Sequence, residues 1–189
     1  SQGIAFLKAL RESGIKRVVA HASSLINLAG EEPLRGKSIE ALVDEIERCD
    51  HLGIEDLVLH PGAHLGQGPE KGFLNLKEGL RIVLDRTENT RVRILLETMA
   101  GQGTVIGARI DLFREVLQGL DWDGRIGLCL DTCHLFAAGY ELREKGSYEH
   151  LVKNFEKNFG LERIGCWHLN DSKAEKGSRR DRHQHLGEG

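Results

Sequence analysis

The sequence has few cysteines, few prolines and no long hydrophobic run. Four cysteines in 189 residues, none in a CxxC pair, are too sparse for a disulfide scaffold. We expect reduced, mostly buried thiols, with Cys129 and Cys133 packing rather than ligating a metal. No apolar stretch approaches the roughly 18 residues that span a bilayer, and no basic-then-apolar signal stretch opens the chain. A cytoplasmic protein without membrane contact is therefore expected.

The chain also lacks a large excess of positive or negative charge. The 26 Lys and Arg residues nearly balance 29 Asp and Glu residues, for a formal net charge of -3. The chain thus lacks the overall basic character of many nucleic-acid-binding proteins. Bound metal ions would alter this balance, because they add charge that a residue count omits. Nine histidines make metal binding worth examining.

A unit of helix, glycine turn and short apolar strand repeats along the chain. Gly14, Gly53 and Gly160 each follow a helical stretch and precede an aliphatic residue, which is typical of a left-handed helix cap. One helix is predicted by apolar residues at helical spacing, namely Ile39, Leu42, Val43 and Ile46. No proline-rich linker interrupts the series, so we predict a single domain over residues 1–189.

The predicted strands are short and continuously apolar, which suits strands buried on both faces of a parallel sheet. They comprise residues 18–21, 57–60, 93–97, 127–131 and 165–168. The spacing of their ends matches a βα unit with a modest loop. The sequence therefore predicts the α/β class, with at least five parallel strands.

Each predicted strand ends in a side chain that is able to hold a divalent metal. These side chains are His21, His60, Glu97, Asp131 and His168. Ligands bind at the carboxyl ends of strands in parallel α/β folds, and an unpaired buried carboxylate there would be costly. Histidine and carboxylate ligands suit zinc, manganese or iron.

Three further candidate ligands lie just past strand ends. They are His134, Asp181 and His183, of which the last two form an i, i+2 pair whose side chains point the same way in an extended segment. Eight nitrogen or oxygen ligands are too many for one tetrahedral ion and suit two or three. Paired ions of this kind hydrolyse phosphoesters in nucleases and phosphatases.

The remaining histidines have other interpretations. We expect His51, at a helix end, and His150, on a helix surface, to lie outside any site. For His64 and His185, a role as a metal ligand and a position outside any site both stay open.

Four motifs resemble the endonuclease IV type of apurinic/apyrimidinic endonucleases, which are zinc enzymes of DNA repair. GLCLDTCH (127–134) and WHLNDSKAEKGSRRDRH (167–183) are similar to the two most specific motifs of that family. HPGAHLG (60–66) and LLETMAGQG (95–103) fit the strand ends between them. The resemblance covers nearly the whole chain.

This resemblance implies a TIM-type (β/α)8 barrel with three zinc ions, although manganese or iron would also suit the ligands. It assigns His21, His60 and Glu97 to the first ion, Glu97, Asp131 and His168 to the second, and His134, Asp181 and His183 to the third. Glu97, the candidate catalytic residue, would bridge the first two ions. The implied substrate is double-stranded DNA with an abasic site, cleaved on its 5′ side to leave a 3′-hydroxyl and a 5′-deoxyribose phosphate. We also expect a monomer.

The chain departs from the family pattern in three respects. Only five βα units are visible, which by the resemblance are the third to the seventh of eight, so we expect a fragment with two exposed sheet edges. The eighth strand, which carries a last glutamate ligand to the second zinc, is not among them. Ser24 stands where the family usually has a tyrosine that helps to distort DNA.

Four residues are candidates for DNA contact. Leu25 and Asn27 fit the family pattern in the segment after the first strand. Lys173 and Arg182 belong to a basic segment beside the predicted ligands, where phosphate contact is expected.

Two alternative functions stay open. A sugar isomerase or epimerase on a related barrel would use one divalent ion, for which Glu97, Asp131 and His168 would suffice. That hypothesis leaves the other five candidate ligands without a role. A remnant that binds DNA or metal without catalysis is the second alternative, suggested by Ser24 and the missing strands.

Overall fold

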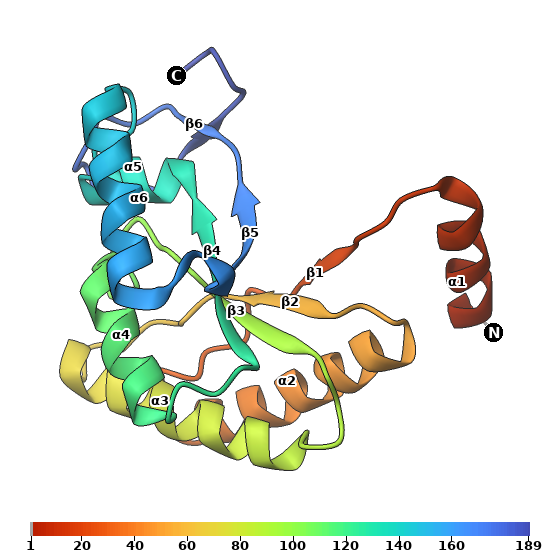
Figure 1. Cartoon of the computed structure of the whole chain (residues 1–189). Coiled ribbons are helices and arrows are strands. Elements are labelled where there is room, and N and C mark those ends of the chain that lie inside the picture. The colour runs from red at the N-terminus through yellow and green to blue at the C-terminus, as the bar shows by residue number, and fades with distance from the viewer. Residues whose placement is uncertain (1) are drawn as a thin grey trace.

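The computed structural model describes residues 2–189, and its centre is a five-stranded parallel sheet (Figure 1). The strands lie in sequential order: β1 (Val19–His21), β2 (Asp56–Leu59), β3 (Arg93–Glu97), β4 (Ile126–Asp131) and β5 (Ile164–His168). The sheet turns strongly between β1 and β5 (Figure 1). It forms part of a (β/α) barrel, which confirms the predicted class and the incomplete TIM-type architecture.

Helices alternate with the strands along the chain, and most of them pack on the outer face of this sheet (Figure 1). They are α1 (Gln2–Ser13), α2 (Leu34–His51), α3 (Pro69–Arg86), α4 (Ile110–Gly119), α5 (Thr132–Ala138) and α6 (Lys145–Phe159), followed by a 3-10 turn at Leu161–Arg163. The apolar stripe predicted for α2 is confirmed, because all four of its residues are buried. By contrast, α1 has no buried residue and lies beyond the start of β1 (Figure 1), where Phe6 packs against the edge of the core beside the end of α2.

The three glycine turns all have positive φ, but Gly160, with a ψ of 135°, does not form the predicted left-handed helix cap. The φ angles are 72° at Gly14, 65° at Gly53 and 80° at Gly160, a region that favours glycine because it lacks a Cβ atom. After α2, the amide of Gly53 donates to the carbonyl of Asp50 at 3.0 Å and closes the helix. Each turn redirects the chain from a helix toward the next strand.

Strand bounds differ from the prediction by one residue at several ends. The last paired residue of β2 is Leu59, so His60 lies just beyond the strand. Pro61 follows and has no amide hydrogen with which to extend the ladder. Strand β1 begins at Val19, whereas β4 and β5 begin one residue earlier than predicted. Two short strands were not predicted: β6 (Asp171–Ser172) and β7 (His183–Gln184), which pair antiparallel.

Alternate strand residues face opposite sides of the sheet. The side chains that pack against the helices include Leu57, Leu59, Ile94, Leu96, Leu128 and Leu130. A second cluster on the inner face contains Val58, Leu95 and Cys129. Burial on both faces explains why β2, β3 and β4 are apolar, whereas the edge strands β1 and β5 are only partly buried, contrary to the expectation for all five strands.

The inner face has a charged layer at the amino ends of the strands. Asp56 is fully buried there and pairs with two arginines. Its carboxylate accepts from Nε of Arg93 at 2.7 Å and from Nε of Arg17 at 3.1 Å. These two arginines compensate the buried charge of Asp56, which would otherwise be costly. The opposite, carboxyl end of the strands carries the candidate ligands.

Between residues 2 and 189, no helix combines the length and the hydropathy that crossing a bilayer requires.

Candidate metal centre

All eight predicted ligands line one pocket at the carboxyl ends of the strands. Four of them end β1, β3, β4 and β5, and His60 directly follows β2. The pocket has a volume of about 520 Å³. It is lined by His21, His60, Glu97, Asp131, His134, Trp167, His168, Leu169, Asn170, Asp181 and His183.

Glu97 lies at the centre of this pocket, with its side chain 2% exposed. Its Oε2 atom is 3.1 Å from Nε2 of His21 and 3.0 Å from Nε2 of His60. Its Oε1 atom is 2.9 Å from Nδ1 of His168 and 3.4 Å from Nδ1 of His134. One carboxylate thus joins two pairs of imidazoles, an arrangement that suits a ligand shared between two cations.

Asp131 connects the end of β4 to the start of α5. Its Oδ1 atom accepts from the backbone amide of His134 at 2.9 Å and caps the helix. Its Oδ2 atom accepts from Nδ2 of Asn170 at 3.0 Å, and its own amide donates to Oγ1 of Thr98 at 3.0 Å. Sequence reasoning did not identify Asn170 or Thr98, although each lies within two residues of a predicted ligand.

Backbone carbonyls orient two of the histidine rings. Nδ1 of His134 lies 2.8 Å from the carbonyl of Thr98, and Nδ1 of His21 lies 2.8 Å from that of Ala22. Because a carbonyl only accepts hydrogen bonds, both rings carry a hydrogen on Nδ1. Their Nε2 atoms are therefore the ones presented for ligation.

The β6–β7 hairpin carries Asp181 and His183 into the pocket. Backbone hydrogen bonds from Gly177 and Arg179, 3.1 and 2.9 Å long, dock its loop on the end of α5. The amide of Asp181 donates to Oε1 of Gln102 at 3.2 Å, which ties the hairpin to the loop after β3. Residues far apart in sequence are thus held on one side of His134.

Among the described residues, three sets made of nitrogen and oxygen donors alone lie close enough to share a cation. Within each of them the atoms are within 4.8 Å of one another: His21, His60 and Glu97; Glu97, Asp131 and His168; and Asp131, His134 and His183. Asp181 contacts the last set, 3.2 Å from Nε2 of His134 and 2.9 Å from Nε2 of His183. The structure therefore brings all eight predicted ligands together.

One buried ring nitrogen favours a cation in this pocket. Nε2 of His134 is buried and makes no hydrogen bond, although it lies 3.2 Å from the carboxylate of Asp181 and faces the ring of His183, whose centroid is 5.0 Å from its own. An orphaned buried donor atom is costly. An ion held by these nitrogen and oxygen atoms would satisfy it.

Electrostatics in the pocket also favour positive charge. Burial opposes ionisation of Glu97, but hydrogen bonds from the four histidines outweigh it and hold the pKa of Glu97 below its usual value. Hydrogen bonds to Asp131, Cys129 and Glu97 raise the pKa of His168 to about 12. Burial lowers the pKa of His134, but Glu97, Asp131 and Asp181 together raise it to about 9. A bound cation would supply this positive charge in place of the imidazole protons.

The other histidines lie outside the pocket. Nδ1 of His64 accepts from two amides of its own loop at 3.2 Å, so this ring shapes the loop. His185 is exposed and belongs to no donor set of the described residues. His51 ends α2, where Nδ1 lies 2.7 Å from the carbonyl of Glu47, and His150 is exposed on α6.

The candidate DNA contacts lie near the pocket in different environments. The side chain of Leu25 is 84% exposed on the loop after β1. The side chain of Asn27 is hydrogen-bonded within the protein. Its Nδ2 atom donates to the backbone carbonyl of Ala63, and its Oδ1 atom accepts from the backbone amide of Ala63, both at 2.9 Å. Lys173 and Arg182 are exposed on the hairpin, where the amide of Lys173 donates to the carbonyl of Arg182 at 2.8 Å.

Comparisons with known proteins agree with this geometry. The family model described as xylose isomerase-like TIM barrel matches residues 3–189. The chain is 44% identical to a protein named probable endonuclease 4 from Chloroflexus aggregans, over 98% of this chain and 65% of that protein. A protein of the same name from Geotalea daltonii is 40% identical over 97% of this chain and 65% of its own length.

Solved structures show the same likeness. The crystal structure of endonuclease IV from Thermus thermophilus superposes with a TM-score of 0.85 at 36% identity, covering all of this chain and 65% of that one. A D-tagatose 3-epimerase-like protein superposes with a TM-score of 0.74 at 26% identity, covering all of this chain and 67% of its own.

The chain spans about two thirds of the length of the curated relatives that it matches, as the count of five strands led us to expect. The resemblance to endonuclease IV proteins that the sequence motifs indicated is confirmed by these relatives. The family match, the five parallel βα units and the ligand-bearing strand ends together show that this chain belongs to the xylose isomerase-like TIM barrel family.

Proposed function

We propose that this protein hydrolyses the phosphodiester bond 5′ to abasic sites in double-stranded DNA, using metal ions, expected to be zinc, bound in the pocket around Glu97. The convergence of eight histidine and carboxylate side chains on one pocket carries this proposal. The names of the relatives support DNA as the substrate. The expected products are a 3′-hydroxyl and a 5′-deoxyribose phosphate.

The donor sets indicate which residues would hold each ion. His21, His60 and Glu97 would hold the first, and Glu97, Asp131 and His168 the second. For the third, the family resemblance assigns His134, Asp181 and His183; Asp181 lies 3.2 Å from Nε2 of His134 and 2.9 Å from Nε2 of His183, and the observed donor set of these two histidines also includes Asp131. Such ions, when bound, activate water and neutralise the charge on the attacked phosphate and the departing oxygen. Manganese and iron accept the same donors, so zinc is the expectation that elemental analysis must test.

The chain's own residues prepare the pocket for this chemistry. Glu97 stays ionised although it is nearly inaccessible to water, because four imidazoles surround it. The carbonyls of Ala22 and Thr98 hold two rings in the ligating orientation. Asn170 restrains Asp131, so a ligand of the second set keeps its position without an ion.

Leu25, Lys173 and Arg182 are the proposed contacts to DNA. Since Ser24 is small, Leu25 is the large exposed side chain that this loop offers to a distorted duplex. The two basic residues would contact phosphates beside the pocket. Asn27 serves these contacts indirectly, since its hydrogen bonds with Ala63 hold the loop in place.

A sugar epimerase is the second candidate function. The likeness to the D-tagatose 3-epimerase-like protein favours it, because Glu97, Asp131 and His168 alone would hold a single ion. It gives no role to the buried, unpartnered Nε2 atom of His134 or to the hairpin that carries Asp181 and His183. The nuclease accounts for these residues and is therefore preferred.

Cleavage of an end-labelled duplex with one abasic site tests the proposal. The zinc-reconstituted chain should cut that strand on the 5′ side of the lesion and leave an undamaged duplex intact. His134→Ala should abolish cleavage, whereas His185→Ala, which changes an exposed histidine outside the pocket, should not. Interconversion of ketohexoses without DNA cleavage would favour the epimerase. Zinc binding without either activity would favour the catalytically inactive remnant.

A further inference from the structure

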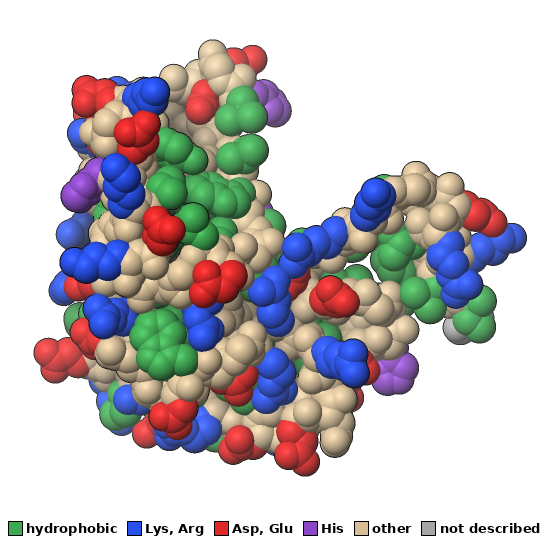
Figure 2. Space-filling view, in the orientation of Figure 1, with side chains coloured by type: hydrophobic (Ala, Val, Ile, Leu, Met, Phe, Trp, Pro, Cys, Tyr) green, Lys and Arg blue, Asp and Glu red, His purple; other side chains and the backbone are tan. Residues whose placement is uncertain are grey.

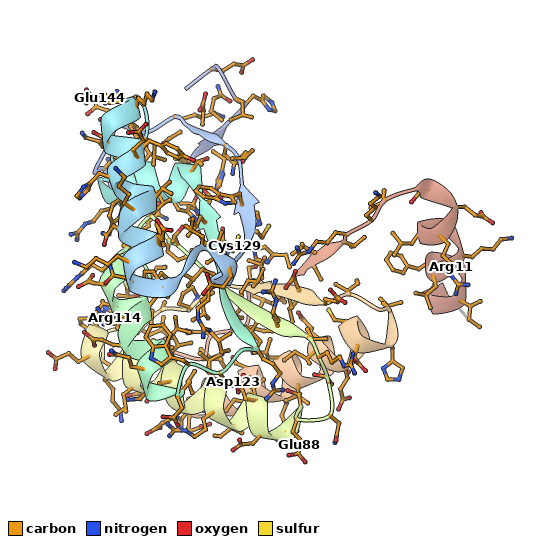
Figure 3. All side chains as sticks on the ribbon, viewed as in Figure 1. Arg11, Glu88, Arg114, Asp123, Cys129 and Glu144 are labelled. Atoms are coloured by element: carbon orange, nitrogen blue, oxygen red, sulfur yellow. The ribbon has the colours of Figure 1, made fainter. Side chains whose placement is uncertain are left out.

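Two cysteines face each other on the inner side of the barrel, below the pocket. Cys129 in β4 and Cys166 in β5 are directly paired residues of neighbouring parallel strands. Figure 3 labels Cys129, which lies where these two strands run side by side. Their Sγ atoms and a ring nitrogen of His168 all lie within 4.8 Å of one another. The trio is thus a donor set in its own right.

These donors differ in chemistry from those around Glu97. A tetrahedral ion with metal–sulfur bonds of about 2.3 Å holds two sulfur atoms roughly 3.8 Å apart, a separation within the range of this set. Two thiolates and one imidazole prefer soft cations, whereas carboxylates suit harder ones. Neither Glu97 nor Asp131 belongs to the trio.

Although the sequence led us to expect that Cys129 packs rather than ligates, we propose that Cys129, Cys166 and His168 form a binding site for a soft, thiophilic cation such as Cd²⁺ or Cu⁺, which shares only His168 with the carboxylate-containing sets. Each thiol loses its proton to solvent as its sulfur–metal bond forms, so no oxidant or reductant is needed. This inference depends on the donor geometry alone and is independent of the proposed nuclease activity.

A cation has a route to this site. Cys166 is half-buried on β5, which is the last strand of the sheet, and the side chain of His168 is 29% exposed at the pocket. His168 also faces Glu97 at 2.9 Å and Asp131 at 3.6 Å. A soft cation would therefore engage an imidazole that the second carboxylate-containing set also uses.

Cys133 provides a matched control. It is buried near the same pocket, within 4.8 Å of donor atoms of Asp181 and His183, but that set contains a single sulfur. A soft cation should therefore prefer the trio with two sulfurs. Replacing Cys133 tests whether any nearby buried thiol would give the same result.

Cadmium titration of the metal-free, reduced chain tests the proposal, followed through the ultraviolet charge-transfer absorption of cadmium–thiolate bonds. We expect a saturable band, with Cys166→Ser weakening cadmium affinity at least about tenfold and reducing the band. Cys133→Ser should leave both unchanged. Absence of a band in the unaltered chain, an unaltered band in Cys166→Ser, or its loss in Cys133→Ser would each overturn the proposal.

Alkylation provides a second measurement that needs no variant, which matters because Cys129 is fully buried and its replacement risks the fold. Stoichiometric Cd²⁺ should slow labelling of Cys166 at least about tenfold, a ligand-protection effect scored by peptide mass spectrometry. Mg²⁺, a hard cation, should not protect it. Equal labelling rates with and without Cd²⁺ would contradict the assignment.

Discussion

Replacement of Glu97 by glutamine is the sharpest test of the pocket. The substitution keeps the size of the side chain and removes its negative charge. Two of the three proposed ion sets contain Glu97, so we expect the metal content to fall from about three ions per chain to about one. Its carboxylate lies 2.9 to 3.1 Å from three imidazoles.

The expected loss of activity follows from the loss of these ions. Bound ions would stabilise the charge that develops in the transition state, and removal of one such electrostatic stabiliser typically slows turnover about 10²–10³-fold. Loss of two ions should therefore slow turnover at least about 10³-fold. DNA affinity should change little, because the proposed contacts at Leu25, Lys173 and Arg182 are untouched.

Single-turnover cleavage of an abasic duplex, paired with elemental analysis, measures both quantities. Glu88→Gln serves as the control, because Glu88 is exposed after α3 and far from the pocket (Figure 3). The control should match the unaltered chain in metal content and rate. Near-normal turnover of Glu97→Gln with a full metal content would refute the bridging role.

Three further predictions concern binding, pH and thiol reactivity. Lys173→Ala or Arg182→Ala should each reduce the slope of log DNA affinity against log salt concentration by about one. Lys8→Ala, on the distant α1, serves as the control. Unchanged slopes in filter-binding titrations would assign the hairpin to an ordinary solvated surface. In the metal-free chain, the pKa of His134 is raised from 6.5 to about 9. Protonated His134 therefore stabilises the folded state fully below pH 6.5, and this stabilisation is lost as the pH rises through 9. The thermal unfolding midpoint should fall across that interval, and a His134→Gln variant with the same slope would contradict this origin. Iodoacetamide should label Cys166 well before the three buried cysteines, as mass spectrometry of the native chain would show.

The surface has an apolar region beside the last strand that the composition did not indicate. Figure 2 shows hydrophobic side chains gathered between α6 and β5. Leu169 and Leu186 are 62% and 64% exposed, and with Phe136 and Leu142 they line a hollow of about 370 Å³. Exposed apolar surface at an edge strand is what an incomplete barrel was expected to show.

Local patterns were sufficient to predict the strands and most of the pocket. Buried parallel strands must be apolar on both faces, so their positions follow from short apolar runs, and the polar residue that ends each run lies at the edge where ligands gather. The observed strand ends differed from the predicted ones where pairing with the neighbouring strand sets the end. His60, for example, lies beyond the last residue pair of β2 and β3. The β6–β7 hairpin escaped prediction because each strand has only two residues and depends on docking against α5.

What the sequence determined by itself was the fold class and the identity of the eight candidate ligands, because residue type and strand periodicity are local properties of the chain. Only the tertiary structure decided how these ligands combine. It placed four histidines around Glu97, left Nε2 of His134 buried without a hydrogen bond, and paired Cys129 with Cys166 across β4 and β5. These contacts depend on the register of strands that lie far apart in sequence, and register is set by packing of the whole sheet.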